Sequence, residues 1–552
     1  MSAELIANQN PDAELLTREG GSIPSTESQR RRFALFSDGR VVHAKGERWS
    51  AELSHLLGAA QRKGLRFTEF IEAEIPTILD LYQAAHGRND QDAVSAALQL
   101  ERQVDLADIL RQAGADQASD VHIRVLKRYT EIRVRVYGRV KDLTSRKSEE
   151  GMALIKAAFA VASDLAGTSS DLSFQQGALT AKSGLLPNRV EMVRLQYSPT
   201  SDGRGALVMR LKYEAPANEI EIDHLGYNAQ QIRDISIMRK RTNGMYVLAG
   251  KVSSGKSTTL QRVLNKMFVD KNKEISMYTI EEPVELDLPG AIQVPVKKNP
   301  DGTDGFVEAM KASLRSDPNV IVLGETRSTE TAKLAVQAVM TGHALWSTVH
   351  AGTALGILDR LTDLGVESWK LQDPTVVRGL VYQRLTGVMC RHCRITLREA
   401  VARRQVEKTL AVELCKLFNK SPDVLYARGE GCPKCKLGLS GRTVVAETVL
   451  TDPKLLEFYA RGERSQMREY WLRTREDGGL GGVPVLHHAL SKFGAGLCDI
   501  NEIEEEVDLF EIYKRDFMFL KDRLRRDVEA LDAQEAAKAK AETEAEIANA
   551  KK

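Results

Sequence analysis

The segment Gly250–Ser257, which reads GKVSSGKS, constrains the fold of this chain more than any other part of the sequence. It fits the pattern G-x-x-x-x-G-K-[ST], in which a glycine-rich loop wraps around phosphate groups. An apolar run, MYVLA (245–249), precedes the loop, and a helical pattern beginning TTLQRVLNKMF follows it. Together with the further strands and helices that alternate after it, this order predicts a parallel α/β sheet that carries a phosphate loop.

The residue types in this loop suit the binding of ATP and magnesium. Glycines let the backbone approach a phosphate closely, and the amides at the start of the helix supply donors and a partial positive charge. We expect Lys256 to reach the β- and γ-phosphates as a point charge, and the Ser257 hydroxyl to ligate Mg²⁺. The expected nucleotide-binding residues of the loop are Gly250, Ser253, Ser254, Gly255, Lys256, Ser257 and Thr258.

Carboxylates follow two other predicted strands. In DPNVIVLGETR, Glu325 lies just beyond a short apolar run, at the strand end where ligands of parallel sheets collect. Glu325 is therefore the candidate general base for the attacking water. In TIEEPVEL, the residues Glu281, Glu282 and Glu285 would repel one another unless a cation or arginines share the site. Glu282 is the second catalytic candidate, and a solvated acidic turn is the alternative interpretation.

The segment TGHALWSTVHAGTA carries one histidine at each end of an apolar strand pattern, His343 and His350. Such a strand can place one imidazole near the γ-phosphate as a sensor or a donor. We assign this role to His350. Structural or solvent-exposed histidines are the alternative interpretation of the pair taken alone.

Four of the six cysteines form two C-x-x-C knuckles that 38 residues separate. Each knuckle places two thiolates on one turn, and the two together make a tetrahedral sulfur set that suits Zn²⁺. The wide separation requires an inserted helical excursion between them. The expected zinc ligands are Cys390, Cys393, Cys432 and Cys435. A dithiol redox pair, or His392 as a ligand, is the alternative.

The length of 552 residues suggests three or four domains. The expected units are residues 1–30, a mobile N-terminus; 31–105, a docking or regulatory domain; 106–215, an α+β domain with an arginine-bearing sheet; 219–385, the P-loop domain; 386–445, the tetracysteine zinc element; and 446–552, a helical C-terminal region with a frayed tail. Helical periodicity is expected across FTEFIEAEIPTILDLYQAA (67–85). Apolar and basic residues alternate in EIRVRVYGRVKDL (131–143), which predicts strands with arginines on one face.

Composition narrows the classes of protein further. Lys and Arg number 78 against 76 Asp and Glu, a net charge of +2, so no global field favours nucleic acid or acidic membranes. No window offers 18 uncharged apolar residues, and the N-terminus lacks the basic start and apolar run of a signal peptide. Six cysteines are too few for a disulfide scaffold. We therefore expect a soluble, multidomain cytoplasmic protein.

The order of these motifs resembles the secretion ATPases of type II secretion and type IV pilus assembly. The resemblance rests on the phosphate loop, TIEEPVE, ASLRSDPNVIVLGETRSTETA, TGHALWSTVHAGTA, QRL (383–385) and the paired knuckles, and it covers about residues 106–450. ASDVHIRV and EIRVRVYGRV are similar to the family's SDIHIEP and RFRIDG stretches. The resemblance implies a RecA-like ATPase domain with an acidic Asp box at EEPVE and a His box at TGH…H.

The resemblance also implies a cytoplasmic homo-hexameric ring, held peripherally at the inner membrane, whose ATP hydrolysis moves a membrane platform protein. It further implies that some arginines of the α+β domain contact phosphates across domains or subunits. These are Arg133, Arg135, Arg194 and Arg210. Assembly is favoured over retraction because assembly ATPases of the family commonly carry the tetracysteine element. Ser328 stands where the family usually has Asp, and Tyr137 replaces an acidic residue, so the chain resembles a divergent branch such as a type IVb or conjugative pilus system.

Several other functions remain as alternatives. A pilus retraction or type IV secretion ATPase of the same superfamily is the nearest. A nucleic-acid motor is disfavoured by the balanced charge and the 6% aromatic content, so no specific nucleic-acid partner is expected. A non-hydrolysing scaffold is disfavoured by Lys256, Ser257 and Glu325. A small-molecule kinase is disfavoured because the sequence suggests no acceptor pocket beyond the nucleotide site.

Overall fold

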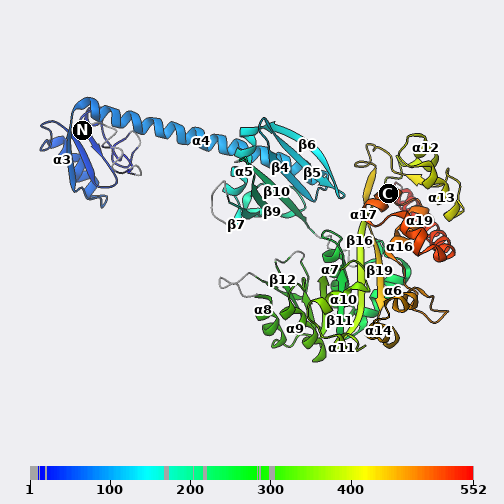
Figure 1. Cartoon of the computed structure of the whole chain (residues 1–552). Coiled ribbons are helices and arrows are strands. Elements are labelled where there is room, and N and C mark those ends of the chain that lie inside the picture. The colour runs from blue at the N-terminus through cyan, green and yellow to red at the C-terminus, as the bar shows by residue number, and fades with distance from the viewer. Residues whose placement is uncertain are drawn as a thin grey trace.

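The computed structural model describes residues 6, 10, 13–18, 21–166, 173–202, 204–214, 221–282, 284, 287–296 and 305–550. A small N-terminal domain stands at one end of a long helix, α4 (Ile75–Ala115), and an α+β domain stands at the other (Figure 1). The P-loop domain and the C-terminal helices form the rest of the molecule (Figure 1). Within the described ranges, no helix is both long and apolar enough to span a lipid bilayer.

The N-terminal domain is built on a three-stranded sheet. Its elements are α2 (Glu27–Arg30), β1 (Phe33–Leu35), β2 (Arg40–Ala44), α3 (Ala51–Gln61) and β3 (Glu69–Ala73). Because β3 pairs in parallel with β2, the first half of the stretch expected to be helical is a strand. The helical prediction is wrong for residues 69–73, because the periodicity of a segment carries no information about a partner strand elsewhere in the sequence. The helix begins after it, with Pro76 in its first turn.

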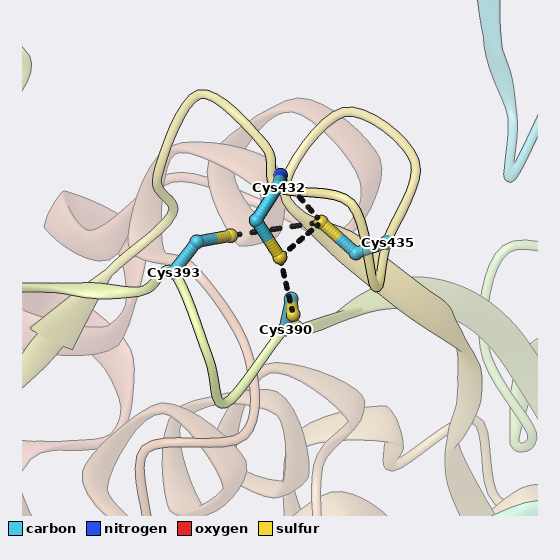
Figure 2. A group of neighbouring side chains, drawn as sticks. All are labelled: Cys390, Cys393, Cys432 and Cys435. Carbon is cyan, nitrogen blue, oxygen red and sulfur yellow. Dashed lines mark hydrogen bonds between the residues drawn. The ribbon is translucent and has the colours of Figure 1, made fainter.

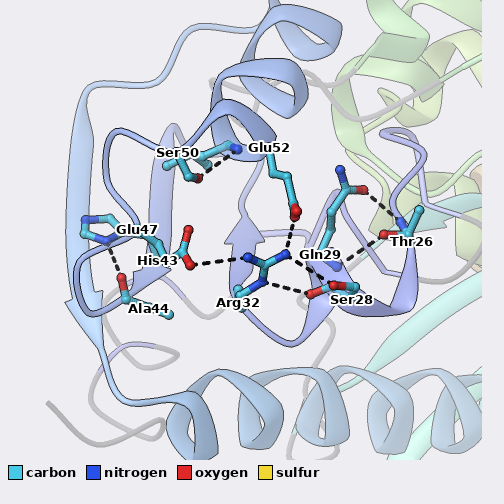
Figure 3. A network of polar contacts seen from close by, with 10 residues as sticks. Thr26, Ser28, Gln29, Arg32, His43, Ala44, Glu47, Ser50 and Glu52 are labelled. Atoms are coloured by element: carbon cyan, nitrogen blue, oxygen red, sulfur yellow. Dashed lines mark hydrogen bonds and ion pairs between the residues drawn. The ribbon is translucent and has the colours of Figure 1, made fainter.

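Part of the segment 1–30, which is expected to be a mobile N-terminus, packs against the N-terminal domain. Ile23 is buried in the core formed by α3 and β1, together with Leu16. The guanidinium of Arg32, the residue before β1, pairs with Glu47 and with Glu52 of α3 (Figure 3). These ion pairs join the start of β1 to the region of α3. The described residues 13–18 and 21–32 are therefore part of the N-terminal domain.

The α+β domain is a seven-stranded antiparallel sheet in the order β6-β5-β4-β10-β9-β8-β7. Its elements are β4 (Asp120–Val125), β5 (Tyr129–Val136), β6 (Arg139–Lys147), α5 (Ser148–Ala160), β7 (Ser163–Ala166), β8 (Gln175–Leu179), η1 (Ala181–Ser183), β9 (Val190–Pro199) and β10 (Gly205–Tyr213). The end of α4 and helix α5 pack on one face of the sheet. The other face carries arginines, as the alternating pattern predicts.

The P-loop domain is a seven-stranded sheet in the order β13-β12-β14-β15-β11-β16-β19. The strands are β11 (Gly244–Ala249), β12 (Met277–Glu281), β13 (Ala291–Pro295), β14 (Val320–Leu323), β15 (Ala344–Val349), β16 (Val377–Met389) and β19 (Leu439–Leu450). All neighbours pair in parallel except β16 and β19. This mostly parallel sheet confirms the predicted α/β class. One correction follows, because β19 extends the sheet past the limit expected at residue 385.

Helices cover both faces of this sheet, so its strands are buried on both sides. One face packs against α8 (Gly305–Leu314), α9 (Thr329–Met340) and α10 (Gly356–Asp363). The other packs against α6 (Ala229–Lys240) and α7 (Lys256–Asp270). The short elements η2 (Asp223–Leu225) and α11 (Ser368–Leu371) complete the domain.

The tetracysteine element is an insertion between β16 and β19. It contains β17 (Ile395–Thr396), α12 (Leu397–Ala402), α13 (Lys408–Phe418) and β18 (Tyr426–Ala427). The C-terminal elements are α14 (Pro453–Ala460), α15 (Arg464–Leu472), α16 (Val485–Gly494), α17 (Ile500–Glu506), α18 (Phe510–Asp516), η3 (Met518–Leu520) and α19 (Lys521–Ala550). The element also reaches the α+β domain, because Lys436 pairs with Asp116 at the end of α4, 2.6 Å away.

Candidate functional site

The phosphate loop follows β11 and ends where α7 begins, as its sequence predicts. Gly255 has a φ of +83°, a left-handed conformation that favours glycine. Lys256 is the first residue of α7, and its Nζ donates hydrogen bonds to the carbonyl oxygens of Gly250 (3.0 Å) and Lys251 (3.1 Å). The ammonium group therefore lies over the loop that is expected to receive phosphates.

The acidic and histidine candidates meet at the ends of adjacent strands. Glu325, just after β14, lies with Oε1 3.0 Å from Nε2 of His350, just after β15. Its Oε2 lies 2.9 Å from Nε of Arg327. Arg327 also reaches Glu282, at 3.6 Å, so one guanidinium joins two of the predicted carboxylates. Carboxylates this close in sequence repel one another unless a cation or arginines share their site, and Arg327 meets this requirement.

Other predicted polar residues do not join this cluster. Glu281, the last residue of β12, also lines the cleft, but its carboxylate accepts hydrogen bonds from Thr279 (2.8 Å) and Gln293 (3.2 Å). His343 precedes β15, at the opposite end of that strand from His350, and its Nδ1 lies 3.0 Å from the carbonyl oxygen of Ala338. Glu285 lies outside the described residues. Of the two histidines, only His350 lies beside Glu325.

A cleft of about 920 Å³ lies between the α+β sheet and the P-loop domain. Its walls include the whole segment 251–258, Glu282, Glu325 and His350 from the P-loop domain. The opposite wall carries Arg135, Arg194 and Arg210. Cations of one domain therefore face the phosphate loop of the other within a single chain.

The arginines form a row across neighbouring strands. Asp120 on β4 pairs in register with Arg135 on β5 and with Arg210 on β10, and Arg210 pairs in register with Arg194 on β9. The buried Asp120 carboxylate lies 2.9 Å from Nε of Arg210 and 3.7 Å from Nε of Arg135. One buried carboxylate thus orients two guanidinium groups.

Arg133, the fourth predicted arginine, does not belong to this row. It lies two residues before Arg135 and forms an ion pair with Asp142 on β6, at 2.9 Å. It is not one of the residues that line the cleft. The predicted set is therefore divided, with three arginines at the cleft and one beside it.

The four predicted zinc ligands converge at the insertion. Their ligand atoms all lie within 4.8 Å of one another, and the Sγ–Sγ separation is 3.9 Å for Cys390 and Cys432 and 3.6 Å both for Cys393 and Cys435 and for Cys432 and Cys435 (Figure 2). All four are free thiols in the structure. Burial, followed by the neighbouring thiols, raises the pKa of Cys393 to about 12. Several thiolates would repel one another unless a cation such as Zn²⁺ shares the set, so the donor set fits that ion.

A family model described as type II/IV secretion system protein matches residues 97–487 of the chain. The chain belongs to this family. It is 31% identical over 440 residues to the type II secretion system ATPase E of Vibrio cholerae serotype O1, a match that covers 76% of this chain and 80% of that protein. It is 32% identical over 394 residues to the type II secretion system protein E of Klebsiella pneumoniae, with coverages of 71% and 74%.

A solved structure, the pilus retraction motor PilT with bound ADP, aligns with 74% of this chain and 98% of its own length. Its sequence identity is 19% and its TM-score 0.48. The assignment of the chain to the type II/IV secretion family therefore depends on the sequence matches, and these confirm the resemblance seen in the motifs.

The departures from the family pattern leave the main contacts in place. In this member of the type II/IV secretion family, Ser328 is the N-cap of α9, and its Oγ accepts a hydrogen bond from the Thr331 amide at 3.2 Å. Serine and aspartate are comparable as N-caps, so the helix start keeps its cap. Arg327, the preceding residue, keeps its contacts with the carboxylates. Tyr137 occupies a turn with a φ of +50° and lines the cleft.

Sequence reasoning missed several cations of this secretion-family site. Arg327 lies in the GETR stretch and Arg384 in QRL, yet neither was assigned a role. Arg139, Arg384 and Arg442 also line the cleft, and burial lowers the pKa of Arg442. Arg139 pairs with Glu505 of α17 at 2.8 Å, which joins the α+β domain to the C-terminal helices. The only signal in the sequence for these cleft-lining arginines was their spacing from the recognised motifs.

Proposed function

We propose that the chain is an ATPase that works as a homo-hexameric ring in the cytoplasm, peripherally at the inner membrane. It powers type IV pilus assembly or a type II-like secretion process through a membrane platform protein. Membership of the type II/IV secretion family supports ATP hydrolysis as the activity. The ring, the platform and the direction of assembly rest on the family resemblance.

One observation carries the proposal. The phosphate loop, the Glu325–His350 pair and three arginines of another domain all border one cleft. Hydrolysis of a phosphoanhydride needs phosphate-binding amides, a group that orients water and cations that offset developing negative charge. These three requirements meet here in one place.

Each group can be given a part in the reaction. Glu325 has four acceptor positions on its carboxylate, of which His350 and Arg327 use two, so positions remain to accept a hydrogen bond from the attacking water. Lys256 and the arginine row would offset the charge that develops on the transferred phosphoryl group. Because the row belongs to the α+β domain, catalysis depends on where that domain stands.

The residues present also fit two metal ions. Ser257 in α7 offers the hydroxyl that would hold Mg²⁺, which when bound would neutralise charge on the phosphates. Cys390, Cys393, Cys432 and Cys435 would hold Zn²⁺ in a closed structural site without an open position for water.

The experiment that tests the proposal measures ATP hydrolysis by the size-fractionated oligomer with magnesium. Wild-type protein is compared with Glu325→Gln, in the presence and absence of DNA. We expect turnover that does not need DNA, and a variant that binds ATP without hydrolysing it.

Three other outcomes would each indicate a different function for this protein. Nucleotide binding without turnover, in a magnesium-loaded ring, would indicate a scaffold. Turnover that requires DNA would indicate a nucleic-acid motor. Hydrolysis together with filament loss, rather than growth, in cells that express the protein would indicate a retraction or other type IV secretion ATPase of the superfamily.

A further inference from the structure

A buried polar chain lies directly beneath the phosphate loop. Gln383 on β16 is fully buried, and its Nε2 donates a hydrogen bond to the carbonyl oxygen of Ser254 in the loop, 2.7 Å away. Its Oε1 accepts one from the hydroxyl of Tyr227, at 2.6 Å. Tyr227 lies 3.1 Å from the Oγ1 of Thr259 in α7. All four residues are less than one-tenth exposed.

The length of β16 places Gln383 at the loop. In the parallel pairing of β16 with β11, Tyr382 lies beside Ala249, the last residue of β11. Gln383 is the next residue, so its backbone lies against Gly250. A Cβ atom at position 250 would stand 2.4 Å from the carbonyl oxygen of Gln383. Both the backbone and the side chain of Gln383 therefore contact the loop.

The chain of donors has only one consistent direction. The single hydroxyl proton of Tyr227 goes to Gln383, so the hydroxyl of Thr259 must donate to Tyr227. If the Gln383 amide were turned over, its oxygen would face the carbonyl oxygen of Ser254, and the bond to the loop would be lost. The carbonyl oxygen of Ser254 thus sets the orientation of the Gln383 amide, and the hydroxyl of Tyr227 anchors the amide in that orientation by donating to its oxygen.

Tyr227 belongs to the segment that enters the P-loop domain from the α+β domain. It comes just before α6, and its neighbour Gly226 is held in turn, because its carbonyl oxygen accepts a hydrogen bond from Nζ of Lys492 at 2.6 Å. A displacement of this entering segment would therefore move the hydroxyl that anchors the amide of Gln383.

We propose that Gln383 and Tyr227 are positioning residues for the nucleotide: Tyr227 anchors the amide of Gln383, which holds the phosphate loop in its binding shape through Ser254. This inference rests on the proposed ATPase function. It adds that the entering segment regulates ATP affinity through one amide. Neither side chain touches the reacting atoms, so their loss affects binding of ATP before it affects the chemical step.

The test compares two variants that each lose one buried tyrosine hydroxyl. Tyr227→Phe removes the hydroxyl that anchors the amide of Gln383. Tyr246→Phe is the matched control, because its buried hydroxyl donates to the carbonyl oxygen of Asn243, at the other end of β11 from the loop. We expect Tyr227→Phe to raise the KM for ATP by about fivefold with kcat nearly unchanged, and Tyr246→Phe to leave both unchanged.

A double variant separates positioning from general loss of structure. Gln383→Leu should raise KM by at least as much as Tyr227→Phe, and adding Tyr227→Phe to it should raise KM no further, because the hydroxyl acts through the amide. Equal KM values in wild type and Tyr227→Phe, or a fall in kcat at constant KM, would overturn the inference. Failure of the proposed function looks different, since wild-type protein itself would then not hydrolyse ATP.

Discussion

Oε1 of Glu325 lies 3.0 Å from Nε2 of His350, so the ends of β14 and β15 are joined by a carboxylate–imidazole contact at the mouth of the cleft. The two residues come from motifs 25 positions apart in the sequence. Parallel strands bring them together because their carboxyl ends share one edge of the sheet. The imidazole therefore controls how the carboxylate faces the cleft, and its removal can be tested directly.

Replacing His350 should lower the rate of hydrolysis rather than the affinity for ATP. We expect His350→Ala to reduce kcat by about 10- to 100-fold, because Glu325 loses the contact that orients it. Steady-state hydrolysis and equilibrium binding of ATP would measure the two effects separately. His343→Ala is the matched control, since His343 lies at the other end of β15. Equal losses in the two variants would contradict a specific role of His350.

The arginine row should support the chemical step from the α+β domain. Arg210→Ala removes one cation from the wall that faces the phosphate loop, and we expect kcat to fall by about 10- to 100-fold. Arg133→Ala removes an arginine from the same sheet, but one that pairs with Asp142 beside the cleft. Its kcat should stay close to that of wild type. A loss that is larger in Arg133→Ala would show that the row has been assigned to the wrong residues.

The tetracysteine group should hold zinc in the purified protein. We expect about one zinc ion per chain by elemental analysis, lost in Cys432→Ser together with a lower thermal unfolding midpoint. Cys415→Ser is the control, because Cys415 is a free thiol of α13 outside the group. It should retain the metal. Zinc-free wild-type protein with an unchanged midpoint in both variants would contradict a structural metal site.

Stability should depend on pH through the buried Lys492. Its Nζ donates to Gly226, Thr443 and Val444, and burial lowers its pKa from 10.5 to about 8. Between these two values only the unfolded state keeps the proton, so this residue adds stability as the pH rises above about 8. That contribution is lost as the pH falls through about 8.

The measurement is the thermal unfolding midpoint of wild type and Lys492→Met at a pH of about 7.5 and of about 9.5. The difference, wild type minus variant, should increase at the higher pH. A difference that stays the same would mean that Lys492 keeps its proton in the folded state as well as in the unfolded state across this range. Titrating groups that lie away from Lys492 change both proteins alike, so the comparison removes their contribution.

Much of the P-loop domain could be predicted because its signals are local. A glycine-rich loop between an apolar strand and a helix specifies its own geometry, and the segment around Lys256 has the expected form. The cysteine knuckles are equally local, and pairing them needed only the chemistry of zinc. The placement of acidic side chains at the carboxyl ends of β12 and β14 followed from the rule that ligands of parallel sheets bind at that edge.

The remaining features depend on contacts between distant segments. The tetracysteine insertion separates β16 from its partner β19 in the sequence. Local patterns therefore place the end of the P-loop domain too early, at residue 385. The strand β3 looked helical because its partner, β2, lies 25 or more residues away. Arg133 and Arg135 are alike in sequence, and only Asp142 and Asp120 on neighbouring strands distinguish them.

The helix α4 has a mechanical consequence. Its 41 residues span about 60 Å, at 1.5 Å for each residue. Its far end carries the N-terminal domain, and at its near end Asp116 is held by Lys141 and Lys436. A rotation of about 10° at that clamp would sweep the N-terminal domain through about 10 Å, if the helix stays straight. The length of the helix thus amplifies a small tilt of its clamped base into a much larger displacement at its far end.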